Sequence, residues 1–202
     1  MQSKRLIVGS FQENTYIVSN HKECILIDPG ANGKKIKDVI YKEGLSLIAI
    51  LLTHGHMDHI GAVDYLYDNF QCPIYIHKED KPLLYDANLN LSYLEKPFII
   101  RSPIIDIESM PRLLDTAIKY IHLPGHTPGS CVFHFVDEKV MFTGDVLFQG
   151  SIGRYDFPLS SKADMIASIN KIKSFPFDAK IYPGHGEATS LSAEKSNNPF
   201  LQ

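Results

Sequence analysis

The chain has 202 residues, of which 44% are hydrophobic and 21% are charged, and its formal net charge is -3. These values are ordinary for a globular protein, and the length is enough for one domain with a sizeable core. The charge balance gives no electrostatic reason to expect a nucleic-acid or anionic-membrane partner. We therefore expect a single domain over residues 1–202 that binds neither.

The N-terminal segment and the cysteines both favour a cytoplasmic protein. Lys4 and Arg5 precede only a short apolar run, which is not typical of a secretory signal. No stretch approaches the roughly 18 apolar residues that a membrane helix needs. Cys24, Cys72 and Cys131 lack CxxC spacing, so we predict neither a disulfide framework nor a thiolate metal site. We expect all three to be packing residues in a soluble protein.

Short apolar, β-branched runs alternate along the chain with segments of helical periodicity. The run over 46–52 is continuously apolar, which is typical of a strand buried on both faces. The predicted strands cover 6–8, 15–18, 24–27, 46–52, 74–76, 118–122, 131–136, 140–143 and 179–182. The predicted helices cover 33–43, 60–70, 80–85 and 164–174. Interleaved strands and helices in two similar halves predict an α/β fold with two sheets covered by helices, a four-layer αββα sandwich.

The most informative segment is the His-rich stretch that follows the buried strand. His54 and His56 are two residues apart, so in an extended loop both side chains point to the same side and can share one metal ion. Asp58 and His59 lie where the next helix begins, and successive helical side chains diverge by about 100°. We expect these two to serve a second centre. The alternative is a solvated loop that is rich in His and Asp by coincidence.

Three further turns carry a possible ligand directly after a predicted strand. They present His126 within 124–130, Asp145 within 143–145 and His185 within 183–186. Each of them alone would be read as an ordinary turn. Together with the first cluster they predict a metal centre, and mixed imidazole and carboxylate ligands suit zinc, iron or manganese better than calcium or magnesium.

These segments resemble the metallo-β-lactamase superfamily from about residue 15 to the C-terminus, which implies the αββα fold. The resemblance also implies that Asp145 bridges two metals and that Asp28 braces the His-rich loop. On the residues alone, Asp28 could equally cap a turn. The implied ligands of the first metal are His54, His56 and His126, and those of the second are Asp58, His59 and His185.

Within the superfamily the chain resembles the glyoxalase II group and its short bacterial relatives, on residues 53–59, 124–130, 143–145, 153–158 and 198–201. The resemblance implies hydrolysis of a thioester such as a hydroxyacylglutathione, with a metal-bridging hydroxide as nucleophile and with Asp58 and Asp145 as catalytic residues. It implies two divalent metal ions, with zinc preferred over iron or manganese. Arg154 and Tyr155 are the candidate substrate contacts. The alternative for Arg154 is a salt bridge to Asp156.

One departure and one alternative remain open. Full-length glyoxalase II has a further helical region after the last ligand, whereas only 17 residues follow His185 here, which puts glutathione specificity in doubt. The alternative is a persulfide dioxygenase of the same fold, with one iron held by two His and one Asp, and the segment 153–157 fits that group too. Two complete ligand sets and the short chain favour the hydrolase over the dioxygenase, and a non-enzymatic metal-binding protein is a third alternative. For His77, His122 and His134 we predict packing or hydrogen bonding, and the sequence does not predict the oligomeric state.

Overall fold

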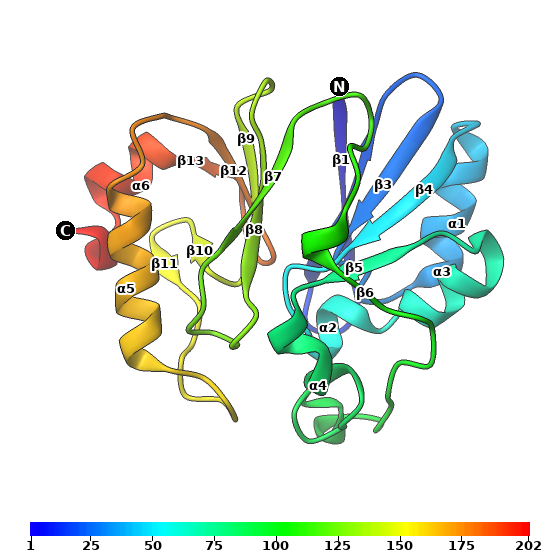
Figure 1. Cartoon of the computed structure of the whole chain (residues 1–202), viewed down its shortest axis with the longest axis horizontal. Coiled ribbons are helices and arrows are strands. Elements are labelled where there is room, and N and C mark those ends of the chain that lie inside the picture. Colours follow the sequence, from blue (N-terminus) through cyan, green and yellow to red (C-terminus); the bar gives the residue numbers. More distant parts are fainter.

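The computed structural model describes residues 1–202, with two β-sheets lying side by side between helices (Figure 1). The first sheet has the strand order β1-β2-β3-β4-β5-β6. β1, β2 and β3 pair in antiparallel fashion, and β3 to β6 pair in parallel. The strands are β1 (Gln2–Val8), β2 (Glu13–Ser19), β3 (Glu23–Ile27), β4 (Ser46–Leu51), β5 (Ile74–Ile76) and β6 (Ile105–Asp106).

The second sheet has the order β13-β12-β9-β8-β7, and a separate hairpin joins β10 to β11. β8 is antiparallel to both β7 and β9, and β12 is parallel to β9, so β7, β9 and β12 share one direction. The strands are β7 (Ile118–His122), β8 (Cys131–Phe135), β9 (Val140–Gly144), β10 (Leu147–Phe148), β11 (Ser151–Ile152), β12 (Lys180–Pro183) and β13 (Thr189–Ser190).

Helices cover the outer face of each sheet (Figure 1). α1 (Gly33–Lys42) and α3 (Val63–Phe70) lie on the first sheet, and α5 (Lys162–Lys173) and α6 (Leu191–Asn197) lie on the second. The shorter α2 (Met57–Ile60) and α4 (Lys81–Leu84) follow β4 and β5. None of these helices is both long enough and apolar enough to cross a lipid bilayer. Single 3₁₀ turns complete the chain at Lys78–Asp80, Ser92–Leu94, Ile107–Ser109 and Pro199–Leu201.

Three apolar clusters separate the four layers, because strand residues alternate between the two faces of a sheet. In β3, Leu26 packs under α1 and α3, while Ile27 packs between the two sheets. In β8, Phe133 joins the layer between the sheets, while Val132 packs against Met165 of α5. The predicted αββα sandwich is therefore confirmed, and the three cysteines are free, buried packing residues as predicted.

The helix predicted over 60–70 is confirmed over Val63–Phe70, but it begins later than predicted because the chain breaks between α2 and α3. The amide of Ala62 donates to the carbonyl of Pro29 (3.0 Å) instead of to a helical carbonyl. Gly61 lies so close to Gly30 that a Cβ would meet its carbonyl oxygen at 2.4 Å. The break lets the first helix present ligand side chains while the second covers the sheet.

The sequence interpretation also missed the structure at the end of the chain. Ser190 caps α6 by accepting a hydrogen bond from the amide of Ala193 (3.2 Å), as polar N-cap residues commonly do. Leu191 then packs on the second sheet. The side chain of Asn198 donates to the carbonyl of Ser151 (3.0 Å) and to Glu194 (2.8 Å), which ties this segment to the β10–β11 hairpin.

All the predicted site residues follow the carboxyl end of a strand. Strands that run in one direction bring their carboxyl ends to one edge of a sheet, and loops at that edge carry the site. In chain order, Asp28 follows β3, the segment 54–59 follows β4, His126 follows β7, Asp145 follows β9 and His185 follows β12.

Candidate metal centre

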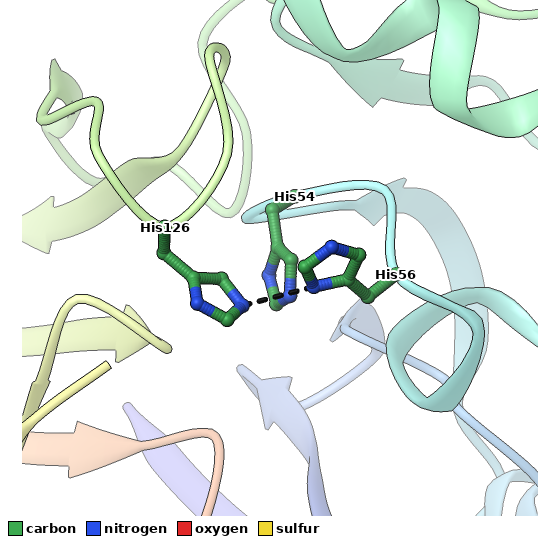
Figure 2. Close-up of side chains that lie close together, drawn as sticks. All are labelled: His54, His56 and His126. Carbon is green, nitrogen blue, oxygen red and sulfur yellow. Dashed lines mark hydrogen bonds between the residues drawn. The ribbon is translucent and has the colours of Figure 1, made fainter. Parts of the chain in front are cut away.

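The seven side chains predicted as metal ligands meet between the two sheets. His54, His56 and His126 form one group whose potential ligand atoms lie within 4.8 Å of one another, and Asp58, His59 and His185 form a second such group. Figure 2 shows the first group, with His126 reaching the two other rings from a separate loop. Residues 54 and 126 are thus brought together by the fold rather than by the local chain.

In the first group the ring nitrogens converge. Nδ1 of His56 and Nε2 of His126 are 2.9 Å apart (Figure 2). Nδ1 of His54 contacts the hydroxyl of Thr53 (3.1 Å), which leaves Nε2 as its remaining ligand atom. All three side chains are buried. Three imidazoles at such spacing are a set that zinc and other divalent transition metals commonly use.

In the second group, Oδ2 of Asp58 lies 3.2 Å from Nε2 of His185 and 3.9 Å from Nε2 of His59. Asp145 lies between the two groups. Its carboxylate oxygens are 3.3 Å from Nε2 of His59, 3.6 Å from Nε2 of His126 and 3.7 Å from Nε2 of His185. Of the carboxylates here, Asp145 is the one that faces both sets of imidazoles, which is the position that a bridging ligand requires.

Asp28 lies under both groups and accepts three hydrogen bonds. The amide and the hydroxyl of Thr53 donate to it at 2.7 and 2.6 Å. Nδ1 of His59 lies 3.0 Å from its Oδ2. Because a carboxylate only accepts, Nδ1 of His59 carries a proton, and Nε2 is the nitrogen that faces the centre as a possible ligand.

His126 is oriented by a backbone group that the sequence interpretation missed. Its Nδ1 donates to the carbonyl oxygen of Arg154 (2.7 Å). A carbonyl has no sequence signature, so the residue pattern could not identify this partner. The contact leaves Nε2 of His126 free to face Asp145 and His56.

The buried polar atoms fit a metal centre. Nε2 of His54, Nε2 of His59 and Oδ1 of Asp145 are buried and have no hydrogen-bond partner, and the same is true of Nε2 of His56. Leaving a buried polar atom unsatisfied costs about 1–3 kcal/mol. A divalent cation satisfies such donor atoms directly, so the nitrogen and carboxylate set suits divalent metals.

The pKa values of the histidine side chains also fit a metal centre. Burial, together with the neighbouring imidazoles, lowers the pKa of His54, and it lowers the pKa of His56 to about 3. These rings are therefore neutral at pH 7 and have lone pairs for a metal. Burial alone would also lower the pKa of His59, but the nearby carboxylates of Asp145 and Asp58 outweigh it and raise that pKa. Metal binding at the second group therefore displaces a proton.

A pocket of about 400 Å³ opens onto the two groups. Its wall is largely apolar and includes Phe11, Leu91, Phe148 and Phe157. Outside the ligand side chains, its polar lining residues are Ser151 and Arg154. A pocket of this size and character suits a small organic molecule.

The two predicted substrate contacts have different surroundings. Arg154 lines the pocket, but its guanidinium makes two hydrogen bonds to Asp156 (2.9 and 3.0 Å) and lies 4.2 Å from the ring centroid of Phe157. Tyr155 is not brought into this pocket. It packs against the third apolar cluster and lines a separate cavity with Met165.

His77, His122 and His134 are packed or hydrogen-bonded, as predicted. His77 stacks on His122 with ring centroids 4.0 Å apart, and Nε2 of His122 donates to the carbonyl of Pro128 (2.7 Å). His134 stacks on Phe177. His77 and His122 also lie near Glu79, although the contact to Pro128 already occupies one nitrogen of His122.

Comparison with known proteins identifies the family. The family model described as the metallo-beta-lactamase superfamily matches residues 8–185, which spans every side chain of the two groups. The chain belongs to the metallo-β-lactamase superfamily. The curated relatives include the probable metallo-hydrolase YqgX of Bacillus subtilis, 35% identical over 100% of this chain and 98% of that protein. Its family and its relatives therefore make the chain a metal-dependent hydrolase, and its ligand groups suit divalent ions.

A second relative indicates which group within the superfamily the chain resembles. The hydroxyacylglutathione hydrolase GloC of Haemophilus influenzae is 35% identical over 96% of this chain and 95% of its own length. This similarity supports membership of a glyoxalase II-like group of metallo-hydrolases. The alignment covers almost the whole of both chains.

Two solved structures match the fold closely. The BLEG-1 B3 metallo-beta-lactamase has a TM-score of 0.92 and is 37% identical, covering 99% of each chain. TTHA1623, solved in a di-iron-bound form, has a TM-score of 0.89 and is 37% identical, covering 98% of this chain and all of that one. The second structure holds two metal ions on the fold described here.

Proposed function

We propose that this chain is a dinuclear metallohydrolase that cleaves a thioester such as a hydroxyacylglutathione. The observation that carries the proposal is the place of Asp145, between two ligand groups at the base of a largely apolar pocket. The first metal would be held by His54, His56 and His126, the second by Asp58, His59 and His185, and Asp145 would contact both. Zinc is the metal we propose, with iron or manganese as alternatives.

Two divalent ions at such a site polarise a carbonyl group and lower the pKa of a shared water towards neutrality. The chain's own contribution is to hold the ligands in place. Asp28 and the carbonyl of Arg154 fix the orientation of His59 and His126. The apolar wall excludes bulk water from the acyl group and strengthens electrostatic interactions within the pocket.

The lining of the pocket favours a leaving group that departs as an anion. Ser151 and Arg154 are its polar residues outside the ligand set, and neither side chain gives up a proton readily near neutral pH. An amine leaving group needs a proton, whereas a thiol with a pKa of about 8.5 can leave as the thiolate. This supports a thioester over an ordinary amide, in agreement with the name of GloC.

The C-terminal segment supports one wall of the pocket. Asn198 and Glu194 hydrogen-bond to the β10–β11 hairpin, which contributes Phe148, Ser151 and Ile152 to the lining. We propose that recognition depends mainly on the acyl part of the thioester, because the wall of the pocket is largely apolar. Glutathione is then one candidate carrier among small thiols.

The direct test measures metal content per chain on untreated protein and hydrolysis of S-lactoylglutathione by the same sample. We expect two metal ions per chain and turnover. Two metals with hydrolysis of other thioesters only would retain the thioesterase and discard glutathione. One iron per chain, no hydrolysis and sulfur-dependent oxygen uptake would replace the proposal with a mononuclear-iron persulfide dioxygenase.

A second candidate is β-lactam hydrolysis, and the similarity to BLEG-1 favours it. A strained cyclic amide is a better substrate than an ordinary amide, since ring opening relieves strain. A chromogenic cephalosporin in the same assay separates the two activities. Faster turnover of the cephalosporin than of every thioester tested would favour the lactamase.

The pairing of Arg154 leads to a prediction about substrate charge. Because its guanidinium is already paired with Asp156, Arg154→Ala should lower kcat/KM for the anionic S-lactoylglutathione by no more than about fivefold. Asp156→Asn should free the guanidinium and lower KM for the same substrate by about two- to fivefold. An uncharged N-acetylcysteamine thioester is the matched control, because neither variant should change its KM. An equal effect on both substrates would contradict a charge-specific role for Arg154.

A further inference from the structure

Asp80 is a fully buried carboxylate next to the metal-site loops, and no predicted role includes it. It lies at the end of the 3₁₀ turn Lys78–Asp80, where β5 leads into α4. Buried acidic residues are uncommon unless they are paired or hydrogen-bonded. The contacts that satisfy this carboxylate therefore show what it does.

Its three donors come from two loops that belong to different sheets. The amide of Gly55, between His54 and His56, donates to Oδ2 (2.9 Å). The hydroxyl of Thr127, next to His126, also donates to Oδ2 (2.7 Å). The amide of Gly129 donates to Oδ1 (2.6 Å). One side chain thus connects the loop of the first two histidines to the loop of the third.

The glycines at both ends of this connection allow the close approach. A Cβ on Gly129 would lie 2.7 Å from the backbone nitrogen of Asp80 and 2.8 Å from its Cβ and Cγ. A Cβ on Gly55 would lie 2.8 Å from Cβ of Leu83 and 3.2 Å from the carbonyl of Asp80. An alanine at Gly129 would therefore collide with Asp80 itself, and one at Gly55 would collide with Leu83 and press on the carbonyl of Asp80.

We propose that Asp80 is a positioning residue that sets the separation of the His54–His56 loop and His126, and with it the affinity and geometry of the first metal. The inference rests on the two-metal site proposed above. Without this carboxylate, two amides and a hydroxyl would lose a shared buried acceptor, and no other carboxylate accepts hydrogen bonds from both loops. Ligands held even slightly out of place bind a metal less tightly, and loss of such outer partners typically costs about 10- to 100-fold in affinity.

At ordinary assay pH, Asp80 is in the carboxylate form that accepts these three hydrogen bonds. Burial raises the pKa of Asp80 to about 6, while its three hydrogen bonds and His122 lower it. At pH 7.5 the group is therefore mainly a carboxylate that accepts from all three donors. Asparagine keeps one acceptor oxygen but places an NH2 group where the second carboxylate oxygen stood. It should therefore retain part of the hydrogen bonding, whereas alanine retains none.

The test compares Asp80→Asn and Asp80→Ala with wild type at pH 7.5. Metal affinity is measured by competition with a chelator, ligand geometry from the visible absorption of the cobalt(II)-loaded protein, and stability from the Tm of the metal-free chain. We expect Asp80→Ala to weaken one of the two metals by about tenfold or more and to change the cobalt spectrum. Asp80→Asn should lie between Asp80→Ala and wild type.

Asp64 provides a matched control. Its carboxylate accepts hydrogen bonds from the backbone and side chains of Arg101 and Ser102, away from the metal groups. Asp64→Ala should lower the Tm without changing metal affinity or the cobalt spectrum. If Asp80→Ala does not fold, Gly129→Ala displaces the same carboxylate and should weaken the same metal.

The outcomes separate this inference from the proposed function. If wild type binds two metals and Asp80→Ala changes only the Tm, as Asp64→Ala does, the positioning role is overturned and the dinuclear site stands. If wild type binds one metal, the dinuclear proposal fails, and weakening of that metal in Asp80→Ala still supports the role of Asp80. If wild type binds no metal, both fail.

Discussion

Replacing Asp145 with asparagine is expected to remove at least one metal ion per chain and to lower hydrolytic activity by about a thousandfold. Asp145 is the carboxylate that faces both groups, with imidazole nitrogens of His59, His126 and His185 within 3.7 Å of its oxygens. An amide is a much weaker metal ligand than a carboxylate and carries no charge to balance two cations. Metal ions contribute several kcal/mol of transition-state stabilisation, and each 1.36 kcal/mol corresponds to tenfold in rate.

The substitution should leave the fold intact, because asparagine has the same shape and the residue follows β9 rather than lying within the apolar clusters. One preparation serves for three measurements: the metal content by elemental analysis, the fold by far-ultraviolet circular dichroism, and the rate of thioester hydrolysis. Asp137→Asn, at an exposed turn, is the control for a change of one charge. Retention of two metals with wild-type affinity by the Asp145 variant would contradict the shared position.

Much of the site could be predicted from the sequence because its residues carry local signals. The segment 54–59 concentrates ligand types directly after a buried strand, and His126, Asp145 and His185 each occupy a Gly-containing turn at a strand end. Parallel strands bring such turns to one edge, so the fold follows from the same pattern that identifies the ligands.

The parts that could not be predicted depend on contacts between distant segments. Asp80 contacts residues 25 and 49 positions away in the chain, and nothing beside it in the sequence marks it as part of the site. The predicted helix over 60–70 breaks because a carbonyl of Pro29 competes for the amide of Ala62. Tyr155 follows Arg154 directly but packs into the third cluster, since the burial of a side chain depends on tertiary neighbours. The cap at Ser190, by contrast, is a local signal that the interpretation overlooked.

Asp28→Asn is expected to weaken both metals by about 100-fold, although the residue contacts neither proposed ion directly. Through Nδ1 of His59, the carboxylate keeps the lone pair of Nε2 facing the second group. Through the hydroxyl of Thr53, which donates to Asp28 and lies 3.1 Å from Nδ1 of His54, it sets the tautomer of His54 as well. An amide can donate where the carboxylate only accepts, and so it favours the tautomers that place a proton on the ligating nitrogens.

Asparagine is the right replacement because Asp28 has a φ of 49°, a left-handed conformation that asparagine tolerates better than alanine does. Chelator competition gives the affinity of each metal in the variant. Thr53→Val is the matched comparison, since it removes the link to His54 but leaves the contact to His59, so it should weaken only the first metal. If Asp28→Asn keeps wild-type affinity at both groups, then the ring orientations do not depend on this carboxylate. If it weakens only the second metal while Thr53→Val has no effect, the link from Asp28 through Thr53 to His54 has no part in holding the first.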